Sequence, residues 1–520
     1  MDRAGGLRTA HPLRHRAHAD RRAARRPACA GHRVTAVVSR IRDRLAPAPE
    51  DVGPATRRAR EAQPAWAARP VRQRAAIALR FHDLLLENED EILDLLQWEV
   101  GKARIHALQE VAAVAGVARH YGRRAAHYLR DRRRRGAVPL LTHVTEVRHP
   151  KGVVGIVGPW NYPLFLSIGD ALPALLAGNA VVIKADEKTP LSVLWAAELL
   201  ARAGLPPGLL HVVTGDGPVV GAALIDQVDY VCFTGSTRTG RVVGKQAAGR
   251  LIGCSLELGG KNPMIVRADA DLDRAVEGAV QACFSNGGQL CLSVERIYVH
   301  ERIAEEFTRR FADRAARMRL GAHYDYTDDM GPLVSQRHLR TVEEHVEDAR
   351  RKGATVRAGG RARPDISPLC YEPTVLTGVT AEMTVHAEET FGPVVSVYPV
   401  SSDEQAVALA NSGSYGLSAS VWTKDTERGR ALARRIIAGA VNVNDGFGAA
   451  IGSVDALMGG MRESGVGRRH GAEGMLKYTE AQTIAVQRLV PMPPQPGVGL
   501  ARNATLINAS LAMMRRLRLR

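Results

Sequence analysis

The chain has 520 residues, 45% of them hydrophobic and 24% charged, which excludes a small disulfide-stapled scaffold and a globally disordered protein and leaves room for two to four domains. The formal net charge is +17, but residues 1–44 carry +9 of it and residues 488–520 carry +6, so the chain between them is nearly neutral. A nucleic-acid partner is therefore not expected.

The chain begins with residues 1–45, which are rich in Arg, Ala and His with almost no apolar period, and we interpret them as a disordered basic extension. From Pro54 to Lys102, apolar residues recur at helical spacing and predict scaffold helices. Beyond Lys151, short apolar runs alternate with helical stretches, which predicts parallel sheets covered on both faces. The strand candidates are 153–157, 180–183, 209–213, 230–233, 297–299, 394–400 and 440–443.

Two charge-free stretches, 152–169 and 405–423, approach the length that crosses a bilayer, but Gly, Pro or polar residues interrupt both. We expect no integral membrane segment, and no secretory signal because the N-terminus lacks an apolar core. The basic C-terminal tail, 491–520, begins with a Pro-rich linker and ends in a stretch that we interpret as a surface helix.

Cysteine placement indicates the compartment and the kind of chemistry available. The six cysteines are far apart and form no Cys-x-x-Cys pair, which favours a reducing cytoplasm and predicts no metal site. Any cysteine chemistry would therefore use a single thiol. We interpret Cys232, Cys254 and Cys283, each in an apolar stretch, as small buried hydrophobes.

Cys291 has a different setting, because two glycines and two amides precede it and let the backbone approach a bound group closely. A thiolate there could attack an electrophilic carbon, although burial as a small hydrophobe is equally compatible with the local sequence. Upstream, Glu257 lies between two leucines before a Gly-Gly turn. Burial there would raise its carboxyl pKa toward the range of a general base.

Two further segments follow predicted strands and precede predicted helices. Asn161, between Trp160 and a Tyr-Pro step, offers an amide that could stabilise an oxyanion, although such a motif alone is an ordinary turn. Gly235 and Ser236 open a helix whose backbone N–H groups suit a phosphate. The generic G-x-G-x-x-G fingerprint is absent, so this signal is weak in isolation.

The ordered set of motifs resembles the aldehyde dehydrogenase superfamily from about Ala55 to Gln487. Each motif is weak alone, whereas the complete set in this order is specific. The matching pieces are Gly158-Pro-Trp-Asn-Tyr-Pro163, Lys184, Gly235-Ser-Thr-Arg-Thr-Gly240, Glu257-Leu-Gly-Gly260, Gly288-Gln-Leu-Cys291, Glu388-Glu-Thr-Phe-Gly-Pro393, Tyr415-Gly-Leu417 and Gly459-Gly-Met-Arg-Glu-Ser-Gly-Val-Gly467.

This resemblance implies an α/β fold of the aldehyde dehydrogenase type, with a Rossmann-like parallel-sheet cofactor domain, a second α/β catalytic domain and a small β oligomerisation arm. The implied organisation is a cofactor domain at 46–127 and 148–257, a catalytic domain at 258–460, and an arm at 128–147 and 477–490. A homodimer or homotetramer would follow from such an arm.

The resemblance also implies residue roles. Cys291 would be the nucleophile, Glu257 the base, and Asn161 with the backbone N–H of Cys291 the oxyanion hole. Thiolate attack on an aldehyde would give a thiohemiacetal, hydride loss to NAD or NADP would leave a thioester, and Glu257 would activate the hydrolytic water. The implied cofactor-binding residues are Pro159, Trp160, Lys184, Glu187, Gly235, Ser236, Gly240, Leu258, Glu389 and Phe391.

Within the family, three stretches look most like the actinobacterial succinate-semialdehyde dehydrogenases of the second type: 282–291, 364–373 and 464–471. They imply oxidation of succinate semialdehyde to succinate. Better-known enzymes of that specificity carry an Arg where Ser285 stands, and residues 167–170 offer no second one. An anionic substrate tail would thus need another cation, and aldehydes of other aliphatic or aromatic specificity stay open.

Other departures concern the cofactor and the scaffold. Glu187 stands where a carboxylate would accept the adenosine 2′-hydroxyl and repel a 2′-phosphate, so we predict NAD over NADP. Asp170 stands where many relatives carry a Lys, and the common N-terminal entry motif is missing before Ala55. An alternative of another class is a catalytically impaired relative that binds polyanions or membranes through its basic termini.

Overall fold

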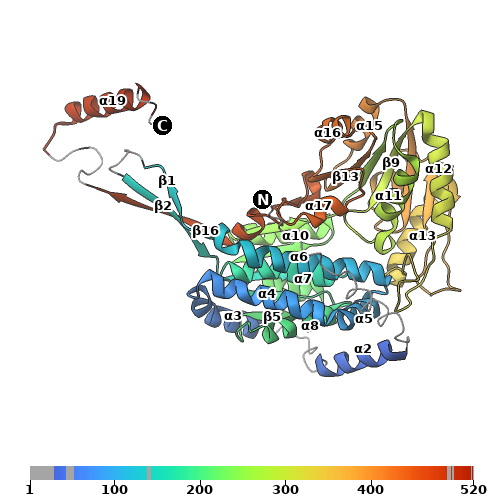
Figure 1. Ribbon diagram of the computed structural model, residues 1–520, viewed down its shortest axis with the longest axis horizontal. Helices are drawn as coiled ribbons and strands as arrows, with labels where there is room; N and C mark the ends of the chain where they lie inside the picture. Colours follow the sequence, from blue (N-terminus) through green and yellow to red (C-terminus); the bar gives the residue numbers. More distant parts are fainter. Residues whose placement is uncertain are drawn as a thin grey trace, which may run out of the picture.

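The computed structural model describes residues 28–41, 52–136, 142–488, 494, 497–516 and 518. Two parallel-type sheets, each covered by helices, form the body, and a three-stranded arm projects away from it (Figure 1). This is the α/β architecture expected from the alternation of apolar runs and helical stretches.

The body begins with helices, as predicted for Pro54 to Lys102; the first of them contacts the first sheet, and the other three pack on helices of that sheet. Gly101, in a left-handed conformation with φ of 74°, ends the third of them. The helices are α3 (Val52–Ala67), α4 (Val71–Glu87), α5 (Glu89–Val100) and α6 (Arg104–Tyr128).

The first sheet has six strands in the order β15-β7-β6-β3-β4-β5, and all neighbours are parallel except β15 and β7. The predicted strands at 153–157, 180–183, 209–213 and 230–233 are confirmed to within one residue. The strands are β3 (Val153–Val157), β4 (Ala180–Lys184), β5 (Leu210–Val213), β6 (Tyr230–Thr234), β7 (Gly253–Glu257) and β15 (Gly465–Val466). Their connecting helices are α7 (Pro163–Leu176), α8 (Pro190–Arg202), α9 (Ala222–Ile225) and α10 (Thr237–Gly249).

The second sheet has seven strands in the order β10-β11-β12-β9-β8-β13-β14, and the predicted strands at 297–299, 394–400 and 440–443 all lie within it. Its strands are β8 (Asn262–Val266), β9 (Val294–His300), β10 (Thr355–Ala358), β11 (Thr374–Thr377), β12 (Val394–Val400), β13 (Ser418–Trp422) and β14 (Ala440–Val443). The helices in this part are α11 (Leu272–Phe284), α12 (Glu301–Ala316), α13 (Gln336–Arg351), α14 (Thr384–Ala387), α15 (Asp403–Ala410), α16 (Thr426–Ala433) and α17 (Gly448–Gly452). Helix α18 (Glu473–Leu476) follows them in the chain and contacts α6 and α7 instead.

The arm is a sheet of β1 (Arg132–Arg134), β2 (Thr142–Pro150) and β16 (Thr479–Gln487), which pair antiparallel in the order β1-β2-β16. Its two long strands come from the segments predicted for an arm, and β2 runs on through Pro150. Helix α19 (Leu500–Arg516) lies beyond the arm and is largely exposed, as expected for a surface helix (Figure 1).

The interpretation of residues 1–45 as a disordered extension is wrong for residues 28–41, which form helix α2 (Ala28–Ile41). Val34 and Val37, spaced by one helical turn, are buried where α2 contacts α5 and α8. Arg40 extends this contact, because it donates to Glu91 at 2.7 Å and to Glu198 at 3.3 Å. The other residues of the predicted extension lie outside the described part of the chain.

Both charge-free stretches belong to the body: 152–169 forms β3 and the start of α7, and 405–423 forms most of α15 and β13. Across the residues that the structure describes, no helix combines the length and the apolar character needed to cross a bilayer.

Candidate active site

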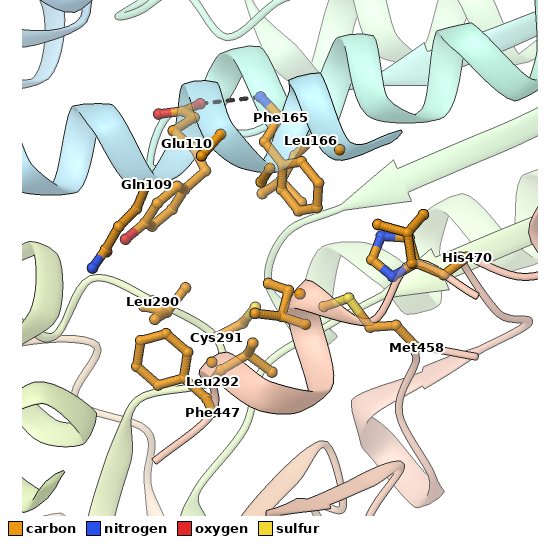
Figure 2. A pocket seen from close by; sticks show the side chains of 18 residues that line it. Gln109, Glu110, Phe165, Leu166, Leu290, Cys291, Leu292, Phe447, Met458 and His470 are labelled. Carbon is orange, nitrogen blue, oxygen red and sulfur yellow. Dashed lines mark hydrogen bonds between the residues drawn. The ribbon is translucent and has the colours of Figure 1, made fainter. Parts of the chain in front are cut away.

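Two cavities meet at Cys291, which among the described residues is the one that lines both. The first, of about 250 Å³, lies at the carboxyl ends of β6 and β7 and between the loops after β3 and before β12. The second, of about 330 Å³, lies between α6, α7 and the loop that holds α17 (Figure 2). A thiol at this junction can contact ligands from both sides.

The Cys291 loop follows the end of α11, where three residues with positive φ reverse the chain: Asn286 (53°), Gly287 (66°) and Gly288 (69°). Glycine tolerates this conformation, which explains the Gly-Gly pair seen in the sequence. Burial, together with the nearby carboxylates of Glu257 and Glu389, raises the pKa of the Cys291 thiol to about 12. The free thiol is therefore protonated at neutral pH and needs a base.

Glu257 supplies a carboxylate on the wall of the first cavity. It is the last residue of β7, only 5% of its surface is exposed, and its Oε1 atom has no hydrogen-bond partner. Burial raises its pKa to about 7, against the opposing effect of the Arg469 charge. An unpaired buried carboxylate with this pKa can accept a proton near neutral pH, as predicted for a general base.

Asn161 lies in the turn between β3 and α7 and links this turn to the cysteine loop. Its side-chain amide donates to the Gln289 carbonyl at 3.1 Å, two residues before Cys291. The side chain is buried and lines the first cavity beside the thiol. The amide and the thiol thus lie on one cavity, and the role of Asn161 as an oxyanion donor stays a prediction.

Two positioning residues behind Asn161 were not predicted from the sequence. Lys102 donates to the Asn161 backbone carbonyl at 2.8 Å and pairs with Glu110 at 2.6 Å, and both side chains are fully buried. Glu110 in turn accepts from the backbone N–H groups of Leu164 and Phe165, and Figure 2 shows the bond to Phe165. These bonds fix the turn that carries Asn161. They join segments that are distant in the sequence, so no local motif predicts them.

The first cavity carries most of the residues predicted to bind a dinucleotide. Glu389 accepts from the Gly260 backbone at 2.8 Å, and Phe391 packs edge-on against Trp160 with ring centroids 5.6 Å apart. Ser236 caps α10, whose N-terminus opens at the cavity. The predicted residues that line this cavity are Pro159, Trp160, Asn161, Gly235, Ser236, Glu257, Leu258, Cys291, Glu389 and Phe391; Thr234 and Gly259 line it without having been predicted.

This residue set fits a dinucleotide. The partly buried carboxylate of Glu389 suits a ribose, a helix N-terminus suits a pyrophosphate, and an aromatic wall suits a flat ring. Burial, with the nearby Glu295 charge, raises the pKa of Glu389 to about 8, so a hydroxyl partner would suit it better than an ion. Among the described residues, no group of three His, Cys, Asp or Glu side chains could hold a metal ion.

Three predicted cofactor residues do not line the cavity. Lys184 and Glu187 lie at and just after the carboxyl end of β4, next to the turn that begins at Gly158. Gly240 lies in the first turn of α10, where its backbone packs directly on the Leu258 side chain. Lys184 and Glu187 thus extend the site along the sheet edge, whereas Gly240 permits the close packing of α10.

Glu187 is half exposed and surrounded by cations. Its carboxylate accepts from Lys188 at 2.8 Å and from Lys184 at 3.4 Å. Burial opposes ionisation, but the Lys188 hydrogen bond and the two lysine charges outweigh it and lower the pKa of Glu187 to about 2. The carboxylate is therefore charged and already partly neutralised.

Asp170, the position where many relatives carry a Lys, forms a buried ion pair with Arg469. The Arg469 guanidinium donates to both Asp170 carboxylate oxygens, at 2.7 and 3.0 Å, and to Thr234 on the cavity wall at 2.5 Å. The pair lies close enough to Glu257 for both charges to act on its pKa. Asp170 replaces the Lys of many relatives, and the Arg469 guanidinium from a distant segment balances its negative charge.

We expect Asp170→Ala to destabilise the first domain by about 3–5 kcal/mol, because it leaves the Arg469 guanidinium buried without a counter-charge. Urea denaturation followed by tryptophan fluorescence measures this as a lower unfolding midpoint. The surface variant Glu306→Ala, which breaks exposed pairs on α12, should leave the midpoint nearly unchanged. Equal midpoints for both variants would contradict this prediction.

The second cavity is lined chiefly by apolar side chains, and no Lys or Arg is among the described residues that line it. Its polar members are Glu110, already paired with Lys102, exposed Gln109 at the edge, Tyr162, Cys291 and His470. The apolar side chains are Phe165, Leu166, Leu290, Leu292, Phe447, Ile451, Val454 and Met458, with small residues between them. An organic chain of moderate length fits such a space.

Comparisons with known proteins agree with this geometry. Residues 39–484 match the aldehyde dehydrogenase family. A Mycolicibacterium smegmatis protein with the provisional name succinate-semialdehyde dehydrogenase (NADP⁺) is 54% identical over 449 residues, covering 86% of this chain and 87% of that protein. A Mycobacterium tuberculosis protein with the same kind of name is 53% identical over 448 residues, covering 86% of each.

A solved structure of an aldehyde dehydrogenase is also similar to this chain, at lower sequence identity. Betaine aldehyde dehydrogenase of Staphylococcus aureus, in complex with NAD⁺, is 32% identical with a TM-score of 0.79 and covers 84% of this chain and 87% of that one.

Proposed function

This chain belongs to the aldehyde dehydrogenase family, and from that premise we propose that it oxidises an aldehyde to the carboxylic acid with NAD or NADP. The single observation that carries the proposal is the position of Cys291 between two cavities, one suited to a dinucleotide and one to an organic chain. A panel of aldehydes, followed by the absorbance of the reduced cofactor, tests it. No turnover with any aldehyde, despite cofactor binding, would contradict it.

The first half-reaction begins at the thiol. The Cys291 sulfur attacks the aldehyde carbon while its proton passes to a base, and Glu257 on the same cavity is the base whose pKa suits the transfer. The oxyanion of the thiohemiacetal then accepts hydrogen bonds from the Asn161 amide and the Cys291 backbone N–H. When bound, the nicotinamide ring supplies the hydride acceptor that converts this adduct to a thioester.

The second half-reaction is hydrolysis. Glu257 first releases to solvent the proton that it took from Cys291, and it then accepts a proton from water as the resulting hydroxide attacks the thioester carbonyl. The Cys291 thiolate leaves with release of the carboxylic acid and regains a proton from Glu257, which restores both groups. The same oxyanion donors serve this step. The intact site, with both Cys291 and Glu257 on one cavity, gives no support to the alternative of an impaired relative that acts through its basic termini.

Succinate semialdehyde is the proposed substrate, supported by the names of the mycobacterial relatives. A second candidate, an uncharged aliphatic or aromatic aldehyde, is favoured by the absence of Lys and Arg from the lining of the second cavity. The ratio of kcat/KM for succinate semialdehyde to that for butanal separates the two candidates.

The cofactor preference predicted from Glu187 lacks support from the relatives, whose names specify NADP⁺. We expect Glu187→Ser to change kcat/KM in favour of NADP by about tenfold relative to NAD, because it removes a carboxylate that would face the 2′-phosphate. Lys188→Ala should change the ratio toward NAD, since it removes the cation beside that carboxylate. Steady-state kinetics with both cofactors measures the ratio of kcat/KM for NADP to that for NAD. If neither variant changed this ratio, the charge of Glu187 would not determine the cofactor preference.

We propose a homodimer or homotetramer and a cytoplasmic location. The projecting arm, whose outer strand β16 exposes Ile484 and Val486, supports assembly. The described cysteines are all free thiols, which supports a reducing compartment. Light scattering of the purified protein tests the assembly.

A further inference from the structure

His470 is a buried polar residue whose side chain has no partner. Only 4% of its surface is exposed, and neither ring nitrogen has a hydrogen-bond partner. Its φ of 63° is a left-handed conformation, which His adopts more readily than most residues. The ring packs edge-on against Phe165 and lies on the same cavity as Cys291 (Figure 2).

A carboxylate that enters this cavity meets few compensating charges. Burying an ionised carboxylate without a partner is strongly unfavourable, so a cation or several donors must meet it. Glu110 is paired with Lys102 and offers no free donor, and Tyr162 stays neutral because burial raises the pKa of its hydroxyl well above the usual value. His470 is the lining side chain that can become a cation at an accessible pH.

We propose that His470 binds the distal carboxylate of the aldehyde substrate and takes up a proton from solvent as it does so. The inference rests on the proposed function and names the residue that recognises the substrate tail. No bond between heavy atoms is made or broken; one proton leaves solvent and forms an N–H bond on the imidazole, and a charge-assisted hydrogen bond forms between the imidazolium and the carboxylate.

The surroundings of His470 explain why the proton arrives only with the substrate. Arg469 beside it, His120 on α6 and Lys477 after α18 oppose a positive ring, whereas Asp170 on α7 favours one. Burial is the largest effect, and together they lower the pKa of free His470 to about 4. A bound carboxylate opposes this shift, so binding of an anionic aldehyde is linked to proton uptake and weakens as pH rises.

The test compares succinate semialdehyde with butanal, which has the same chain length and no carboxylate. Above the pKa of free His470, the ratio of their kcat/KM values should fall by up to about tenfold per pH unit. Dividing by the butanal value cancels the titration of Cys291 and Glu257. His470→Asn keeps a polar side chain that tolerates a positive φ but cannot take up a proton. It should lower the ratio by about 10- to 100-fold at low pH and remove its pH dependence.

His211→Asn, the same substitution at a partly buried His on β5 away from both cavities, should keep the ratio and its slope. Thermal melting and NADP titration of each variant show that it is folded. The inference would be overturned if the ratio of kcat/KM values did not change with pH and was unaffected by His470→Asn. Turnover of butanal in that case would still support the proposed function. Absence of turnover with both aldehydes in the parent protein would overturn the proposed function itself.

Discussion

Cys291→Ser should lower kcat by about 10⁴-fold or more, because a hydroxyl in this cavity has no base strong enough to deprotonate it. Burial already raises the pKa of the thiol to about 12, and Glu257, with a pKa of about 7, accepts that proton only as the sulfur attacks. A serine hydroxyl is a much weaker acid. Initial rates of cofactor reduction measure the loss, and intact-protein mass spectrometry should find no acyl adduct on the variant.

Cys254→Ser is the matched control for this prediction. Cys254 is a partly buried thiol on β7, the strand that ends in Glu257, and it lines neither cavity. Its replacement should leave kcat within about threefold of the parent value, as expected for a substitution away from the reacting atoms. Turnover by Cys291→Ser at the parent rate would show that the sulfur is not the nucleophile.

The segments predicted from the sequence are those in which local pattern decides structure. Strands β3 and β4 of the first sheet are buried along almost their whole length, so their apolar runs end close to the observed strand ends. The backbone before Cys291 has positive φ at Gly287 and Gly288, a conformation that glycine tolerates. The Gly-Gly pair in the sequence therefore indicates this turn. Cys291 and Glu257 were predicted for the same reason, because each lies in a short motif.

Residues that depend on distant partners could not be predicted in this way. Lys102 reaches Asn161 and Glu110 only in the folded chain, and nothing in its own segment indicates a buried cation. The sequence shows an Asp at position 170 where many relatives carry a Lys. It does not show that Arg469, 299 residues away, pairs with this Asp. Helix α2 was missed because its two buried valines stand in an Arg-rich segment whose composition suggested disorder.

Glu257→Gln should separate the two half-reactions. With the hydrolytic base removed, the enzyme should form up to one equivalent of reduced cofactor per active site and then stall as the thioester, with steady-state turnover lower by about 10²- to 10⁴-fold. Attack by Cys291 would itself be slowed, because the thiol loses the same proton acceptor. Stopped-flow absorbance should resolve the burst, and mass spectrometry of the stalled protein should show the acyl group on Cys291.

The pH profile adds an independent check on this assignment. A base with a pKa of about 7 acts in its ionised form, so the rate of thioester hydrolysis in the parent protein should rise with pH through about 7 and then level off. The Gln variant should lack this rise. Glu463→Gln, at an exposed carboxylate paired with Arg241, should keep both the parent rate and its pH profile. If the Glu257→Gln variant turned over without a burst at the parent rate, water activation would have to be assigned to another group, and Glu389 is the other carboxylate on the same cavity.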